Sequence, residues 1–282
     1  MKDFHVVNYH ITGSCNYHCT YCFGKFDRQK DPSFDDAKSI IDNIAGYFAQ
    51  NKIVDGRINF AGGEPMLYNH LDELIDYTSS LGVSVSIVTN ASLLTPERIH
   101  SLKGKVTCIG ISIDSLARDT NMTIGRCSCK HVLSIPELIE LSDAMRECSI
   151  DLKINTVVSK LNINEDLSLL YKALKPKRIK FFQMHLVDGI NDQAKPYEIT
   201  KSEFEAFCNR HKAFQSITLA EPCGSMENSY LMINPEGIFQ LNNHGVYQPF
   251  GSLKNTPLCE ILREVPMDFV KFESRYAVEV RV

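Results

Sequence analysis

Three cysteines lie close together near the start of the chain and could bind a metal. Cys15, Cys19 and Cys22 form the pattern Cys-x3-Cys-x2-Cys, directly after an alternating segment at residues 5–12. Thiolates hold iron–sulfur clusters, usually with one thiolate for each iron. Three thiolates on a four-iron cluster leave one iron open to another molecule. The spacing therefore predicts a reactive cluster rather than a closed metal site.

Zinc is the alternative that these residue types leave open. A structural zinc takes four ligands, commonly as two pairs, and His10 or His18 could supply the fourth. A cysteine can also be a small buried apolar residue, but that role does not account for three of them in one short loop. The residues alone favour an iron–sulfur cluster over zinc.

Strand-like and helix-like segments alternate along the chain. The predicted strands are residues 5–12, 56–63, 83–90, 106–114, 150–158 and 178–186. The predicted helices are residues 34–51, 70–82, 95–104, 135–148, 164–174 and 200–214. Six strand–helix units in succession predict parallel strands joined by right-handed crossovers.

Each predicted strand has one polar and one apolar face, as where Asn8 and His10 alternate with Val7 and Tyr9. A doubly wound sheet is covered on both faces, so its strands are apolar throughout. We therefore predict an α/β fold in which residues 1–220 form a partial (β/α)6 TIM-like barrel with a polar interior. Residues 221–282 are predicted to form a C-terminal extension, with a short β-hairpin turning at residues 235–237.

Composition and charge argue against three classes of protein: nucleic-acid-binding, membrane-spanning and secreted. The 282 residues carry a net charge of -4 and no basic tail, which argues against bulk binding of nucleic acid. No segment has the ~18 consecutive apolar residues of a membrane helix, and the first residues lack the apolar core of a secretory signal. Ten cysteines without regular spacing outside the first cluster indicate a reducing cytoplasm.

The cysteine pattern, with Phe23 after it, resembles the signature of the radical S-adenosylmethionine (SAM) superfamily. Further matching elements follow in the expected order: "GGEP" at residues 62–65, Asn90 in "IVTNAS", Ser112 in "GISIDS" and Arg126 in "IGRC". The resemblance implies a [4Fe–4S] cluster held by Cys15, Cys19 and Cys22, with S-adenosyl-L-methionine chelated to the open iron. An electron from the cluster then cleaves the cofactor to methionine and a 5′-deoxyadenosyl radical. The implied cofactor-binding residues are Phe23, Gly62, Gly63, Glu64, Asn90, Ser112 and Arg126.

Longer segments resemble the viperin family of radical enzymes. They include "NYHITGSCNYHCTYCFG", "INFAGGEPML" and "IKFFQMHLVDG", and the resemblance runs from Asn8 to about Asn242. It implies a lyase that converts a ribonucleoside triphosphate to its 3′-deoxy-3′,4′-didehydro analogue, an antiviral chain terminator. In that reaction the 4′ hydrogen is removed, the 3′ hydroxyl leaves as water, and one electron and a proton complete the product. By family analogy CTP is the first choice of substrate, with UTP and GTP open.

Basic residues on the polar strand faces suit a triphosphate. Positive charges facing one cavity are costly unless an anion neutralises them. The resemblance implies that the triphosphate contacts Arg57, Lys153, Arg178 and Lys180, that Asn8 faces the nucleotide, and that the C-terminal extension closes over it. One departure is that "PEGIFQLN" has no counterpart of a tyrosine that animal members carry before "RFLN", so the role of that tyrosine in turnover is not implied here.

The resemblance also sets expectations for partners. Animal members carry an N-terminal amphipathic membrane helix that this chain lacks, so we expect a soluble, cytoplasmic monomer with no nucleic-acid partner. A flavodoxin- or ferredoxin-like protein is the expected electron donor. Two alternatives stay open: a radical SAM enzyme that modifies a peptide or RNA, and a non-catalytic iron–sulfur or zinc protein. Cys127 and Cys129 do not predict an auxiliary cluster, because the later Cys208, Cys223 and Cys259 are widely spaced and form no ordered array.

Overall fold

The structure is a computed structural model that describes residues 4–24, 30–129 and 131–276. The chain divides into two compact units. The first contains residues 1–15, 24–88 and 225–282, and the second contains residues 16–23 and 89–224. The division falls inside the cysteine loop, so Cys15 belongs to the first unit and Cys19 and Cys22 belong to the second.

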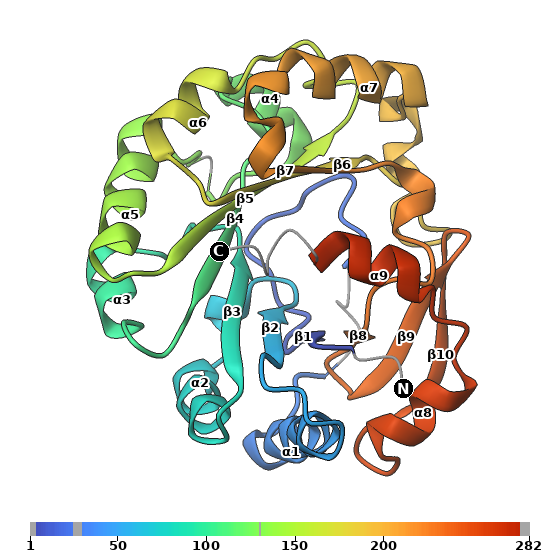
Figure 1. The fold of residues 1–282 in the computed structure, drawn as a ribbon. Coiled ribbons are helices and arrows are strands. Elements are labelled where there is room, and N and C mark those ends of the chain that lie inside the picture. The colour runs from blue at the N-terminus through green and yellow to red at the C-terminus, as the bar shows by residue number, and fades with distance from the viewer. Residues whose placement is uncertain (1–3, 25–29, 130, 277–282) are drawn as a thin grey trace. The chain divides into compact units, whose positions relative to one another are not determined.

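The first unit is built on strands from both ends of the chain (Figure 1). Its strand order is β10-β9-β8-β1-β2-β3. The strands are β1 (Val6–His10), β2 (Arg57–Ala61), β3 (Ser84–Thr89), β8 (Met232–Ile233), β9 (Ile238–Asn243) and β10 (Val246–Ser252). β1 pairs in parallel with β2 and β8, while β9 is antiparallel to β8. The predicted hairpin is therefore confirmed, and Gly237 closes its turn at a φ of +83°.

Helices of the first unit bury apolar faces, and the sequence pattern predicts the first two of these helices. The helices are α1 (Phe34–Gln50), α2 (Leu71–Ser80), α8 (Leu258–Glu264) and α9 (Phe269–Tyr276), with a 3-10 turn η1 (Pro65–Leu67). Ser33 caps α1 by accepting a hydrogen bond from the Asp36 N–H, as a good N-cap residue does. On α9, Phe272 packs edge-on against Phe4, just before β1.

The second unit carries four parallel strands in the order β4-β5-β6-β7. They are β4 (Cys108–Ser112), β5 (Asp151–Val158), β6 (Arg178–Gln183) and β7 (Thr218–Glu221). Its helices are α3 (Pro96–Ser101), α4 (Arg118–Ile124), α5 (Ile135–Glu147), α6 (Ser168–Leu174) and α7 (Lys201–Arg210). The 3-10 turns are η2 (Asp192–Tyr197), η3 (Lys212–Ile217) and η4 (Cys223–Ser225). Ser134 and Thr200 begin α5 and α7 with capping boxes.

All six predicted strands and all six predicted helices are present. Among the described residues, the helices and strands that were not predicted are α4, α8, α9, β7 and β10. α4 escaped prediction because it is short, has no side-chain cap and buries only Asn121 and Ile124. β7 has four residues. β10 contains Pro249 and an irregularity in its register with β9, both of which weaken a strand pattern.

The predicted polar and apolar faces are clearest in β5. Leu152, Ile154, Thr156 and Val158 are buried, and the residues between them are partly exposed. In β1 both faces are buried, because the polar side chains are themselves enclosed. Across the described ranges, no helix is long and apolar enough to cross a membrane.

Candidate active site

The loop that carries Cys15 is packed directly against the "GGEP" turn of the first unit. The Gly63 N–H donates to the Thr12 carbonyl at 2.8 Å, and the Glu64 N–H donates to the Ser14 carbonyl at 2.7 Å. A Cβ atom added at Gly63 would lie 2.2 Å from the Ser14 oxygen. Gly62 has a φ of +149°, and its added Cβ would lie 2.5 Å from the Thr12 oxygen. These glycines are therefore required for the close approach of two backbones.

Glu64 has a defined local role in the same turn. Its side chain is fully buried and accepts a hydrogen bond from the Met66 N–H at 3.1 Å, so it caps η1. Cofactor contacts of Gly62, Gly63 and Glu64 stay predictions, because the interactions seen are those that shape the loop around Cys15.

Cys19 and Cys22 lie together in a turn of the second unit. The Cys22 N–H donates to the Cys19 carbonyl at 3.1 Å. Both thiols are partly exposed, as is Cys15, and none of the ten cysteines forms a disulfide. Partly exposed thiols on a loop are donors of the kind that an iron–sulfur cluster takes. Within the described part of the chain, no three His, Cys, Asp or Glu side chains are already grouped as a metal site.

A short segment after α4 supports this turn. The His18 N–H donates to the Gly125 carbonyl at 3.1 Å, and the Thr20 N–H donates to the Ile124 carbonyl at 2.8 Å. The Cys19 Sγ lies 3.8 Å from the Gly125 oxygen. Gly125 has a φ of +85°, and an added Cβ would lie 2.3 Å from the His18 oxygen. Only glycine fits here, and it brings Arg126 next to the cysteine turn.

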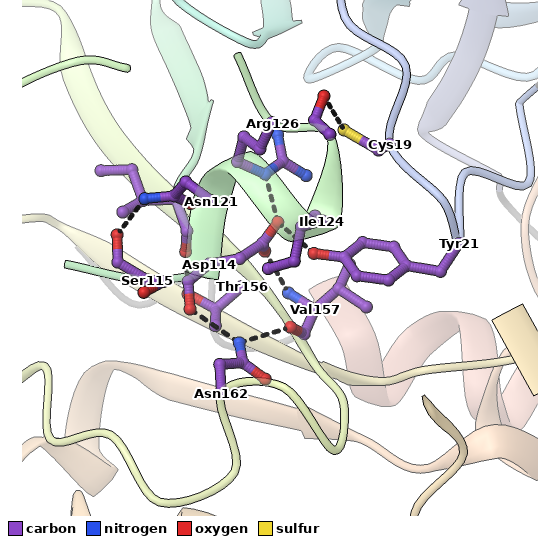
Figure 2. A network of polar contacts seen from close by, with 12 residues as sticks. Cys19, Tyr21, Asp114, Ser115, Asn121, Ile124, Arg126, Thr156, Val157 and Asn162 are labelled. Atoms are coloured by element: carbon purple, nitrogen blue, oxygen red, sulfur yellow. Dashed lines mark hydrogen bonds and ion pairs between the residues drawn. The ribbon is translucent and has the colours of Figure 1, made fainter. Parts of the chain in front are cut away.

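A buried carboxylate connects the turn to Arg126 (Figure 2). Asp114, just after β4, is completely buried, and its Oδ2 accepts a hydrogen bond from the Tyr21 hydroxyl at 2.6 Å. The same oxygen is in ion-pair contact with the Arg126 Nε. The Asp114 Oδ1 accepts from the Val157 N–H at 2.7 Å. One carboxylate thus joins the cysteine turn, the end of β4, β5 and the segment after α4.

The electrostatics of this network fix the protonation of its members. Burial, and then the nearby Asp114 carboxylate, raise the pKa of the Tyr21 hydroxyl well above its usual value. Burial is the largest single influence on Arg126 and opposes its charge, but the neighbouring groups, with the Asp114 carboxylate first among them, together outweigh burial and raise the guanidinium pKa. The phenol is therefore neutral and donates, and the guanidinium is charged.

Asn90 lies in a closed set of side-chain hydrogen bonds within the second unit. Its Nδ2 donates to the Asn16 Oδ1 at 2.9 Å, and its Oδ1 accepts from the Ser92 N–H at 2.9 Å. The Asn16 Nδ2 donates to the Ser92 hydroxyl at 2.8 Å. Asn90 therefore ties the loop after β3 to the residue after Cys15.

The other predicted cofactor residues of the second unit are accessible. Ser112 is partly exposed at the end of β4 and is in register with Asn155 of β5. Phe23 is 37% exposed, a high value for a large apolar side chain. The structure places neither one in the hydrogen-bond network around Asp114 that the described contacts define.

Asn8, a predicted substrate residue, lies in a row of polar side chains across the sheet of the first unit. Asn8 on β1, Asn59 on β2 and Ser86 on β3 are in register. The Ser86 hydroxyl donates to the Asn59 Oδ1 at 2.9 Å, and the Asn59 Nδ2 donates to the Asn8 Oδ1 at 2.8 Å. Asn8 also donates to the Leu231 carbonyl at 3.2 Å. Arg57 is partly exposed at the start of β2.

Predicted substrate residues of the second unit lie on neighbouring strands. Lys153 of β5 is in register with Arg178 of β6, so their side chains emerge on the same face. Lys153 is partly exposed, whereas Arg178 and Lys180 are buried. The Lys180 Nζ lies 3.3 Å from the Glu221 Oε1, and both side chains are buried. Lys180 therefore has Glu221 as a counter-charge within the protein, and its contact with the triphosphate stays a prediction.

Sequence analysis missed the roles of several residues. Neither Asp114 nor Tyr21 was given a function from the sequence. An acidic residue at the end of an apolar strand, with an arginine shortly after it, is the signal that could have found the pair. Glu221 was missed because β7 was not predicted.

Comparison with known proteins extends this picture. The sequence profile of the radical SAM superfamily matches residues 9–169. The S-adenosylmethionine-dependent nucleotide dehydratase of Psychrobacter lutiphocae is 34% identical, covering 96% of this chain and 94% of the relative. The enzyme of the same name from Selenomonas ruminantium is 33% identical, covering 96% and 98%.

A solved structure confirms the predicted fold class. Streptococcus suis SuiB bound to precursor peptide SuiA matches with a TM-score of 0.74, covering 95% of this chain and 66% of SuiB. Sequence identity is 16%, so the likeness concerns the fold alone.

Proposed function

This chain belongs to the radical SAM superfamily and, within it, to the S-adenosylmethionine-dependent nucleotide dehydratases, and we propose that it dehydrates a ribonucleoside triphosphate. The product is the 3′-deoxy-3′,4′-didehydro nucleotide, which lacks the 3′ hydroxyl that a polymerase extends and acts as an antiviral chain terminator. CTP is the first choice of substrate, with UTP and GTP as the other candidates. The observation that carries the proposal is the similarity to dehydratases along almost their whole length.

The adjacent cations of β5 and β6 support a triphosphate. Lys153 and Arg178 stand side by side in register, so two positively charged side chains share one face of the sheet. A guanidinium offers a planar fork to phosphate oxygens, and an ammonium offers a mobile point charge. Lys180 is proposed to contribute together with Glu221, as a neutral pair at the edge of the phosphate site.

The cluster and cofactor have proposed ligands in this chain. Cys15, Cys19 and Cys22 would hold a [4Fe–4S] cluster. The residues proposed to bind S-adenosylmethionine are Phe23, Gly62, Gly63, Glu64, Asn90, Ser112 and Arg126. The reduced cluster and the bound S-adenosylmethionine would together supply a 5′-deoxyadenosyl radical, which would remove the 4′ hydrogen of the nucleotide. Asn8 and Arg57 are proposed to orient the nucleotide, and residues 221–282 are proposed to close over it.

Partners and location follow as part of the same proposal. Ten cysteines that form no disulfide suit a reducing cytoplasm, where a flavodoxin- or ferredoxin-like protein would supply electrons to a monomer. The alternative of a peptide substrate has weaker support, because the peptide-bound neighbour shares only its fold with this chain.

The test is an anaerobic assay of the reconstituted enzyme with S-adenosylmethionine, a chemical reductant and one nucleotide at a time. Formation of 5′-deoxyadenosine should rise strongly with one ribonucleoside triphosphate and little with its monophosphate. Equal rates with and without every nucleotide would contradict the proposal.

A further inference from the structure

We propose that Asp114 is a positioning residue that holds the Cys19–Cys22 turn and Arg126 in one fixed arrangement. The proposal rests on the proposed function, which gives the turn a role in holding the cluster and gives Arg126 a role in binding S-adenosylmethionine. Asp114 itself acts through other residues, since its carboxylate is completely buried.

Each oxygen of the Asp114 carboxylate has its own task. The Oδ1 accepts the Val157 N–H at 2.7 Å, which anchors the side chain to β5. The Oδ2 accepts a hydrogen bond from the Tyr21 hydroxyl and is in ion-pair contact with the Arg126 Nε. The backbone is fixed as well, because the Asp114 carbonyl accepts the Asn162 Nδ2 at 2.6 Å. A buried carboxylate held at this many points is a rigid reference for the two groups that meet it.

The contacts form a closed ring with the cysteine turn, and Figure 2 shows the part of it that joins Tyr21, Asp114 and Arg126. Tyr21 lies between Cys19 and Cys22 and reaches Asp114. Asp114 reaches Arg126, and the preceding Gly125 carbonyl accepts the His18 N–H. Among the described contacts, the Tyr21 hydroxyl is thus the one side-chain group of the turn that bonds to the Asp114 carboxylate. Removing it should let the turn move relative to Arg126 while the Asp114–Arg126 pair stays.

The first test replaces that link alone. In Tyr21→Phe, we expect the KM for S-adenosylmethionine to rise about tenfold, the size of one lost hydrogen bond to a charged group, with a smaller change in kcat. The electron paramagnetic resonance spectrum of the reduced cluster should also respond more weakly to added S-adenosylmethionine. Iron content should stay close to that of the wild type.

Matched variants separate positioning from general stability. Tyr77→Phe removes another tyrosine hydroxyl that donates to an aspartate, Asp42, at the protein surface, and should leave both readouts unchanged. Asp114→Asn should reproduce the Tyr21→Phe phenotype. The double variant should be no worse than Asp114→Asn alone, because residues that act through one contact are not additive. An unchanged KM and an unchanged spectral response in Tyr21→Phe would overturn the proposal.

A measurement on the cluster-free protein covers the case in which a variant binds no iron. Hydrogen exchange of the Thr20 and Cys22 amides, which donate to the Ile124 and Cys19 carbonyls, should be faster in Tyr21→Phe than in Tyr77→Phe. Equal protection would count against positioning by Asp114. Failure of the proposed function would give a different result from failure of positioning by Asp114. The spectral response to S-adenosylmethionine would persist in the wild type, but no nucleotide would stimulate the cleavage of S-adenosylmethionine.

Discussion

The Tyr21 hydroxyl donates to the Asp114 carboxylate at 2.6 Å, and both side chains are buried. This bond joins the residue between two predicted cluster ligands to the end of β4. The same carboxylate pairs with Arg126, so two elements that the cofactor is expected to touch share a single support.

Removal of that support should be strongly destabilising. Asp114→Ala leaves the largely buried Arg126 charge unpaired and the Tyr21 hydroxyl and Val157 N–H without an acceptor, which should lower the free energy of unfolding by about 3–5 kcal/mol. Urea unfolding of the cluster-free protein measures this. Asp143→Ala is the control, because Asp143 pairs with Arg146 at the surface, and its loss should cost no more than about 1 kcal/mol. Similar losses in the two variants would contradict the account.

The glycine contact beneath Cys15 gives a second prediction. Gly63→Ala places a methyl group against the Ser14 backbone, which cannot yield as a flexible side chain can. We expect a loss of stability of about 1–3 kcal/mol and a marked loss of reconstituted cluster, measured as iron and sulfide per chain. Gly46→Ala is the control, since nothing lies within 4 Å of its added Cβ in α1, and it should stabilise the helix by about 0.5–1 kcal/mol. Normal cluster loading in Gly63→Ala would show that the loop tolerates a shift.

Because His10 is buried, we predict that the stability of the protein depends on pH. Burial lowers the pKa of His10 to about 4, whereas an unfolded histidine titrates near 6.5. Between these values the unfolded state binds more protons, so stability is lost as the pH falls from about 6.5 towards 4. His10→Asn should reduce the slope of unfolding free energy against pH in this window. His244→Gln, at an exposed position, should keep the wild-type slope, and equal slopes in all three proteins would refute the assignment.

Much of the fold was predictable because the predicted strands carry an alternating pattern and four of the predicted helices begin at a capping residue. Ser33, Thr95, Ser134 and Thr200 all act as the N-caps of helices. The short α4, β7 and β10 were not predictable, because elements of so few residues show no clear repeat of apolar positions. The cysteine pattern and "GGEP" identified the site region, but the Asp114 ring depends on contacts between residues about 90 positions apart, which no local pattern encodes.

The paired cations of β5 and β6 predict a dependence on phosphate number. Lys153→Ala removes a charge next to Arg178 and should raise the KM for the triphosphate roughly tenfold to a hundredfold, as one charge-assisted contact of about 1.5–3 kcal/mol implies. The monophosphate should be affected little. Steady-state 5′-deoxyadenosine formation with the tri-, di- and monophosphate measures this. Lys177→Ala, at an exposed residue before β6, serves as the control, and an equal loss for all three nucleotides would remove Lys153 from the phosphate site.

The most direct test of the dehydratase assignment follows the 4′ hydrogen itself. The nucleotide that best stimulates S-adenosylmethionine cleavage is prepared with deuterium at C4′ and incubated anaerobically with the reduced enzyme. Mass spectrometry should find deuterium in the 5′-deoxyadenosine. The nucleotide product should be lighter than the labelled substrate by one deuterium atom and one hydroxyl group. Deuterium retained in an unchanged nucleotide, with unlabelled 5′-deoxyadenosine accumulating, would contradict the account.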